Sequence, residues 1–90
     1  MDGTPRLGHG FRFQWEPAQS CHVLLYPEGM IRLNQSAGEI LARCDGNRDI
    51  AAIVADLEQA FARPGLRPEV EAFLTMAIGK RWLHLDAPTP

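Results

Sequence analysis

The order of apolar and polar residues divides the chain into a β-rich first third and a helical remainder. From Phe11 to Trp15 aromatic and polar residues alternate, which is the pattern of a strand with one buried face. His22 to Tyr26 is a second β-prone segment. Pro27-Glu28-Gly29 is a tight-turn sequence, so Met30 to Leu33 should return antiparallel to that segment. The pattern predicts a small three-stranded antiparallel sheet.

The segment from Met30 to Leu41 changes from strand-like alternation to helical spacing. Asn34 or Ser36 is the candidate N-cap, because either side chain can accept a hydrogen bond from the free N–H groups of a first turn. Ser36 with Glu39 also fits a capping box. The apolar residues that follow recur at helical spacing and predict a first helix over residues 36–43: Ala37, Ile40, Leu41 and Cys44.

Two further helices follow. Cys44-Asp45-Gly46-Asn47 stops the first helix at a glycine that tolerates left-handed backbone, and Asp49 is the N-cap candidate of the second. The second helix has one continuous apolar stripe: Ile50, Ile53, Val54, Leu57 and Phe61. The third is expected from Pro68 to Lys80, with its own stripe: Val70, Phe73, Leu74, Ala77 and Ile78.

The ends of the chain contain little pattern. Residues 1–10 carry Gly3, Pro5, Gly8 and Gly10 without periodicity, so we expect a flexible N-terminal arm. Residues 82–85 alternate and predict a short last strand, and residues 86–90 read as a tail. Residues 11–85 are then a single α+β domain of the winged-helix type, with a three-stranded antiparallel sheet followed by three helices.

Composition and charge narrow the function. Ninety residues with 46% hydrophobic content make one modest core. Nine basic against eleven acidic residues give a net charge of -2, which argues against a general nucleic-acid binder. No apolar run approaches the roughly 20 residues of a membrane span, and no signal-peptide order is present, so we expect a cytoplasmic protein without membrane contact. Cys21 and Cys44 lack metal-ligand spacing, so no metal or cofactor is expected.

Two functional alternatives arise from the residues. The second and third helices could form the helix-turn-helix of a DNA-binding regulator, but the third opens with Glu69 and Glu71, whose charge has the wrong sign for phosphate. An enzyme could use adjacent Cys21 and His22, but no second His or Asp stands at a telling position. The residues alone therefore favour no catalytic function.

Several short motifs in one order resemble the pyrroloquinoline quinone (PQQ) biosynthesis protein D family, PqqD. The similarity runs from about Phe11 to Leu83. It rests on these pieces: Arg32-Leu33-Asn34, Glu39-Ile40-Leu41, Cys44-Asp45-Gly46, Ile53, Leu57, Val70-x-x-Phe73-Leu74 and Trp82-Leu83. Two positions depart from a regular pattern. The family often has Gly before the Trp, where this chain has Arg81, and Gly38 lies inside the first helix, where it costs about 1 kcal/mol relative to Ala.

The resemblance implies a noncatalytic peptide chaperone, similar to the recognition domains of ribosomally made, modified peptides. Such a protein holds the precursor peptide PqqA and presents it to the radical S-adenosylmethionine enzyme PqqE, which joins a Glu and a Tyr of the peptide. The iron–sulfur chemistry belongs to the enzyme, and this chain has no Cys cluster of its own.

The resemblance also implies where the peptide binds: it adds as a strand to the edge formed by Met30, Ile31, Arg32 and Leu33, beside the helix from Pro68 to Lys80. We expect Ile31 and Leu33 to face the core, leaving Arg32 either to bind a peptide carboxylate or to be an ordinary solvated residue. On the helix, the candidate contacts are Glu71, Leu74, Thr75 and Ile78; the regular spacing of Phe73, Leu74 and Ile78 favours core packing for these three. Trp82 is either core or an anchor at the end of the groove.

An unpaired third strand is also a place where two copies can meet. Edge-to-edge pairing or exchange of N-terminal hairpins would give a homodimer that competes with peptide binding.

Overall fold

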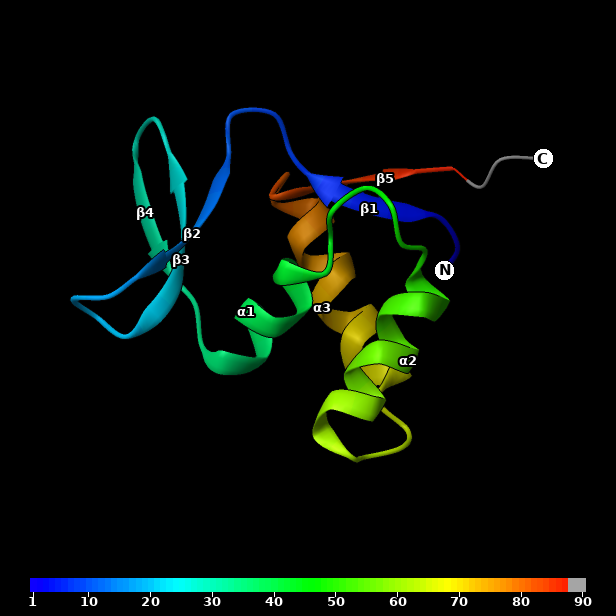
Figure 1. Cartoon of the computed structure of the whole chain (residues 1–90). Helices are drawn as coiled ribbons and strands as arrows, with labels where there is room; N and C mark the ends of the chain where they lie inside the picture. The colour runs from blue at the N-terminus through cyan, green and yellow to red at the C-terminus, as the bar shows by residue number, and fades with distance from the viewer. Residues whose placement is uncertain (88–90) are drawn as a thin grey trace.

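The computed structural model describes residues 1–87, which form two small antiparallel sheets and three helices (Figure 1). The predicted three-stranded sheet is confirmed: it consists of β2 (Arg12–Glu16), β3 (Cys21–Tyr26) and β4 (Gly29–Arg32), in that order. Leu24 on β3 lies opposite Phe13 on β2 and Ile31 on β4, and its side chain is fully buried. The alternation of side chains therefore places one face of the sheet on the core.

The first helix, α1 (Gln35–Ala42), begins directly after β4. Asn34 is its N-cap, and the Asn34 Oδ1 atom accepts a hydrogen bond of 2.8 Å from the Ala37 N–H. The Ser36–Glu39 capping box was wrong, because Ser36 already lies inside the helix and the Glu39 carboxylate pairs with Arg43 instead. A short strand-to-helix connection therefore determines where α1 begins relative to β4.

Gly38 has a packing function. A Cβ atom added at Gly38 would lie 2.8 Å from Nδ1 of His22 on β3, which is too close for any side chain to occupy without a shift. The glycine lets α1 approach the sheet, which accounts for a residue that is otherwise unfavourable inside a helix.

The second helix, α2 (Ile50–Phe61), has Asp49 as N-cap, with a hydrogen bond of 2.8 Å from the Ala52 N–H to Asp49 Oδ1. Its stripe is buried except for the last member, Phe61, which is 39% exposed and so departs from the expected continuous stripe. The third helix, α3 (Arg67–Gly79), buries Val70, Leu74 and Ala77. The predicted helices and their order are thus confirmed to within one residue at the ends of α1 and α3.

An ion pair joins the first two helices. Arg43, at the end of α1, donates from Nε to Asp56 Oδ2 on α2 at 2.5 Å, and this hydrogen bond lowers the pKa of the Asp56 carboxyl. The same guanidinium donates to the backbone and side chain of Glu39. The network is partly exposed, so it serves to orient the helices more than to stabilise them.

The flexible N-terminal arm was wrong for most of its length. Residues Thr4–Leu7 form β1, which pairs antiparallel with β5 (Leu83–Asp86) and so joins the two ends of the described chain. The Pro5 carbonyl accepts a 3.1 Å hydrogen bond from the Gly46 N–H, and the Gly3 carbonyl accepts one of 3.2 Å from the Ile50 N–H. Backbone hydrogen bonds therefore attach this segment to β5, to the loop after α1 and to the start of α2.

The last strand was predicted, but its partner was not. Asp86, expected in the tail, belongs to β5, and the rest of that predicted tail from residue 88 lies outside the described residues. The α+β class holds, with the additional β1–β5 ribbon beside α3 (Figure 1).

The buried Cys44 thiol gives a testable dependence of stability on pH. Burial raises the pKa of Cys44 from about 9 to about 12, because the thiolate would lose its hydration. Between these two values the unfolded chain releases the proton and the folded chain keeps it, so the free energy of unfolding should fall as pH rises above about 9. Urea unfolding of wild type and Cys44→Ala at about pH 8 and about pH 10 should show a smaller pH-dependent loss in the variant, with Cys21→Ala as control; equal losses would contradict this.

Candidate peptide-binding site

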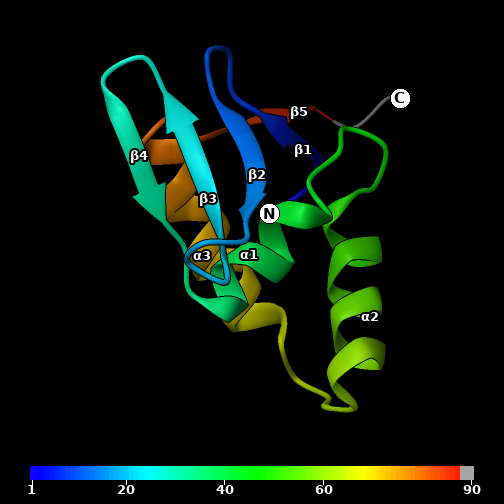
Figure 2. The same cartoon turned by 60° about the vertical axis from the view of Figure 1, so that its left-hand side comes forward.

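The outer edge of β4 carries backbone groups without partners. The Leu33 N–H donates to the His22 carbonyl at 3.0 Å, which makes Leu33 and His22 a hydrogen-bonded pair of the β3–β4 ladder. Because such pairs alternate in an antiparallel ladder, the N–H and C=O groups of Met30 and Arg32 point away from β3. No described strand lies beyond β4 in the sheet (Figure 2). The edge can therefore accept an added strand.

A groove runs between this edge and the helices. We call it the edge groove; its volume is about 320 Å³. It is lined by the end of β4, the start of α1, one face of α3 and a tryptophan before β5: Ile31, Arg32, Leu33, Asn34, Ser36, Ala37, Ile40, Glu69, Phe73, Met76 and Trp82. Its floor is mostly apolar, with charge at two places on the rim.

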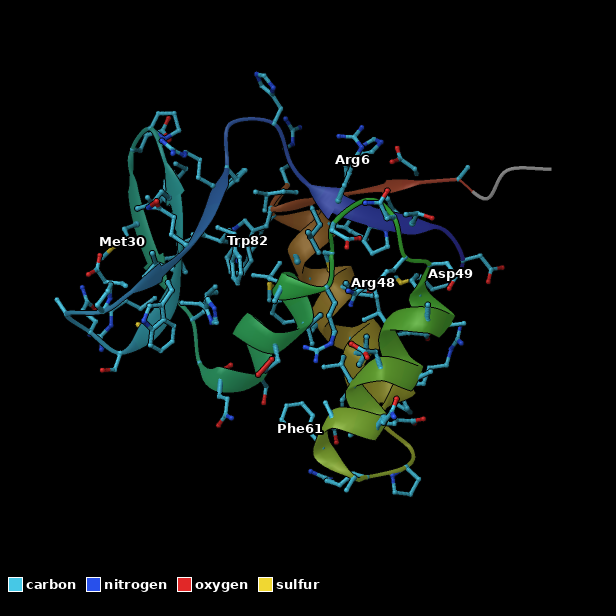
Figure 3. The ribbon with its side chains drawn as sticks, in the orientation of Figure 1. Arg6, Met30, Arg48, Asp49, Phe61 and Trp82 are labelled. Atoms are coloured by element: carbon cyan, nitrogen blue, oxygen red, sulfur yellow. The ribbon has the colours of Figure 1, made fainter. Side chains whose placement is uncertain are left out.

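The strand residues named from the sequence lie at the open edge or line the edge groove. Ile31, Arg32 and Leu33 line the edge groove, with Leu33 buried and Arg32 exposed. Met30 lies at the edge with a side chain that is 42% exposed and points away from the helices (Figure 3). Arg32 forms no ion pair with any described carboxylate, so its guanidinium is free to meet an acidic group.

None of the four residues predicted on the third helix lines the edge groove. Glu71 lies beside the N-terminal amino group of Met1, and its carboxylate accepts a hydrogen bond of 2.8 Å from Arg67 Nε. Thr75 is exposed but does not line the edge groove, and Ile78 lines a different hollow together with Gly8. Leu74 is completely buried in the core, so it supports the groove without being accessible to a ligand. These corrections follow from the rotation of about 100° per residue along a helix.

The residues of α3 that do line the groove are Glu69, Phe73 and Met76. They stand at i, i+4 and i+7, which is a single helix face next to the buried stripe of Val70, Leu74 and Ala77. Met76 is 37% exposed, and Phe73 is half-buried. The signal was present in the sequence as this spacing, but spacing alone does not show which flank of a buried stripe faces the strand.

Trp82 lies between the sheet and α3, at the end of the edge groove (Figure 3). It is half-buried and packs against the core, so core packing is confirmed, while its function as a groove-end anchor stays a prediction. Its position depends on the preceding corner, where Arg81 adopts left-handed backbone with φ of 65°. This conformation explains why glycine suits the place before the tryptophan.

The described residues offer little that could support catalysis or metal binding. Cys21 and His22 are consecutive on β3, so their side chains leave opposite faces, and the His22 ring stacks on Phe13 with ring centroids 4.7 Å apart. The arrangement does not present them as a nucleophile and its base. Among residues 1–87 no cluster of His, Cys, Asp or Glu is arranged to hold a metal ion, and none of the helices there has the length and apolar character to span a membrane.

Sequence relatives match nearly the whole chain. The chain is 57% identical over 87 residues to the PqqA binding protein of Pseudomonas aeruginosa strain UCBPP-PA14, covering 96% of this chain and 95% of that protein. It is 54% identical over 86 residues to the PqqA binding protein of Azotobacter vinelandii, with 94% of each chain covered.

A solved structure and a family model agree with them. The solution NMR structure of the PqqD truncation of Methylobacterium extorquens PqqCD, described as a functional and stand-alone recognition element for ribosomally synthesized and post-translationally modified peptides, matches with a TM-score of 0.68 and 32% identity. The match covers 89% of this chain and 87% of that one. The model of Coenzyme PQQ synthesis protein D (PqqD) matches residues 21–83. The chain therefore belongs to the PqqD family.

Proposed function

We propose that this protein binds the PqqA precursor peptide as an added strand on β4 and presents it to PqqE, without catalysing a reaction itself. The open edge at Met30 and Arg32 is the observation that carries the proposal, since its unpaired N–H and C=O groups match those of an extended peptide. The relatives are named PqqA binding proteins, and this supports PqqA as the peptide.

The edge alone would bind weakly. Met30 and Arg32 offer two N–H and two C=O groups, and each hydrogen bond contributes a net 0.5–1.5 kcal/mol or about 2–6 kcal/mol together. A dissociation constant near 1 μM needs about 8 kcal/mol after the cost of ordering the peptide. Side chains of the peptide must therefore enter the edge groove, where Phe73, Met76 and Trp82 provide apolar contact.

The same geometry suits presentation to a second protein. An added strand directs alternate side chains toward the groove and toward solvent, and only one of its edges pairs with β4. The outward side chains and the outer edge of the peptide remain accessible to an enzyme. Pairing of two copies through β4 stays a prediction; it would occupy the same edge and compete with the peptide.

An amide chemical-shift titration tests the proposal. Synthetic PqqA of Pseudomonas aeruginosa should shift the amides of Met30 and Arg32 and the Trp82 indole in a saturable manner, because these groups form the edge and the end of the groove. A generic DNA duplex should shift none of them. Unchanged edge amides with peptide, or saturable shifts on α3 with DNA, would contradict peptide binding at this site. Cross-linking of the peptide by PqqE, assayed with and without this protein, tests presentation.

A further inference from the structure

A second hollow continues the edge groove beyond the end of β4. We call it the distal hollow; its volume is about 250 Å³ and it lies among the start of α1, the end of α2 and the start of α3. Ser36, Ile40 and Glu69 line both hollows, which are therefore neighbours along one surface path. A chain lying in the edge groove can pass Glu69 and enter the distal hollow without leaving the surface.

The wall of the distal hollow includes one aromatic side chain that is not part of the hydrophobic core. Phe61 is 39% exposed although it continues the buried stripe of α2, and it is the last residue before the left-handed cap at Ala62. Its ring lies at the last turn of α2, on the side toward α1 (Figure 3). Leu57 and Val70, which also line the hollow, are buried. A single exposed aromatic is ordinary, but one that forms the wall of a concave site is placed to contact a ligand.

The charged residues along this path have no partners within the described chain. Arg32, Glu69 and Arg63 form no ion pair with residues 1–87, which is also true of Arg12, Lys80 and Arg81, whereas Arg6, Arg43, Arg48 and Arg67 each form one. The path is therefore basic at Arg32, acidic at Glu69 and basic at Arg63. A complementary peptide would carry an acidic, a basic and an acidic side chain in this order.

We infer that the peptide bound at β4 runs on past Glu69 into the distal hollow, where an apolar side chain contacts Phe61 and a carboxylate pairs with Arg63. The inference rests on the proposed function and adds a second subsite to it. The occupant is the same peptide because the two hollows share three lining residues and because the unpaired charges continue from one into the other. The distal hollow would then select among peptides, while the β4 edge binds backbone regardless of sequence.

Affinity measurements with fluorescent Pseudomonas aeruginosa PqqA test the two contacts separately. Phe61→Ala should weaken binding about tenfold, the effect of losing one well-packed apolar contact. Arg63→Glu should weaken it about fivefold at low salt and less at high salt, since the pair is near the surface. The matched controls are Trp15→Ala, which removes an aromatic ring that is 54% exposed on β2, and Arg12→Glu, the same charge change on that strand. Both should bind the peptide as wild type does.

Peptide variants then locate the contact. Changing each Asp or Glu of the peptide to Lys in turn should yield one variant that binds Arg63→Glu better than it binds wild type. Trimming the peptide from each end should yield one truncated form whose affinity no longer depends on Phe61, and that end is the one in the distal hollow.

The outcomes separate the two proposals. If Phe61→Ala and Arg63→Glu bind like wild type while a backbone change on β4 abolishes binding, the distal subsite is wrong and peptide binding at β4 stands. If the controls on β2 weaken binding as much as the test variants do, or no charge exchange rescues Arg63→Glu, the subsite is also wrong. If the wild-type protein does not bind the peptide at all, both proposals are wrong.

Discussion

Met30→Pro is expected to reduce PqqA binding about 30-fold to 1,000-fold while leaving the protein folded. The Met30 N–H points out of the sheet, so proline there removes a donor for the peptide without breaking a hydrogen bond to β3. The lost bond, together with a peptide carbonyl left unsatisfied, costs about 2–4 kcal/mol, and the proline ring also blocks close approach of a strand. Fluorescence anisotropy with labelled peptide measures the change.

Two further variants separate the effect of the Met30 backbone on peptide binding from that of its side chain and from a loss of stability. Met30→Ala keeps the N–H and should bind within a fewfold of wild type, because the side chain lies on the face away from the groove. Ile31→Pro should instead lower stability, because the N–H of Ile31 belongs to the hydrogen-bonded pair with Leu24. Equal loss of binding in Met30→Ala and Met30→Pro would mean that the side chain, and not the edge backbone, recognises the peptide.

Gly8→Ala is expected to destabilise the protein by about 2–3 kcal/mol. A Cβ atom at Gly8 would lie 2.2 Å from the Arg81 carbonyl oxygen, and the Gly8 N–H already donates to the Trp82 carbonyl at 2.7 Å. Gly8 follows the end of β1 and Arg81 precedes the start of β5, so pairing of the two strands holds both segments in place. Relieving the clash therefore requires that β1 shift or detach. Thermal or urea unfolding gives the loss directly.

The control for this steric effect is Gly79→Ala. Gly79 ends α3, and an added methyl group there meets nothing within 4 Å, so alanine should be neutral or stabilising by up to about 1 kcal/mol. A Gly8→Ala variant as stable as Gly79→Ala would show that β1 is attached loosely and that the N-terminal segment behaves as the arm first expected. Trp82 fluorescence should shift in Gly8→Ala, since its carbonyl holds the displaced segment.

The parts of the fold that the sequence predicts are those held by local patterns. Alternation across Phe13 and Gln14, the Pro27-Glu28 turn and the N-cap at Asp49 each act within a few residues, and the structure confirms them. β1 was missed because it contains Pro5 between two glycines and depends on pairing with residues about 80 positions later. A strand that forms because a distant segment pairs with it need not show any periodicity in its own sequence.

The candidate site divides in the same way. The position of Ile31 and Leu33 on the inner face of β4 could be predicted, because a strand has only two faces; that the edge binds peptide stays a prediction. On α3 the buried stripe has two flanks of similar polarity, and choosing Glu69 over Glu71 requires knowing where the sheet packs. The position of the sheet relative to α3 depends on the connection at Asn34, between β4 and α1, and on the left-handed turn at Arg81, before Trp82.

Pairing of β1 with β5 has a consequence for how the protein can be joined to others. Thr4 and Asp86 lie opposite each other in the ribbon, at the end of the molecule away from β4 (Figure 1). A domain, a label or a solid support attached before β1 or after β5 would therefore emerge near the same place, with the open edge of β4 left facing outward. Fusions in either order should accordingly be equivalent in reach, and tethering by either end should orient every copy alike.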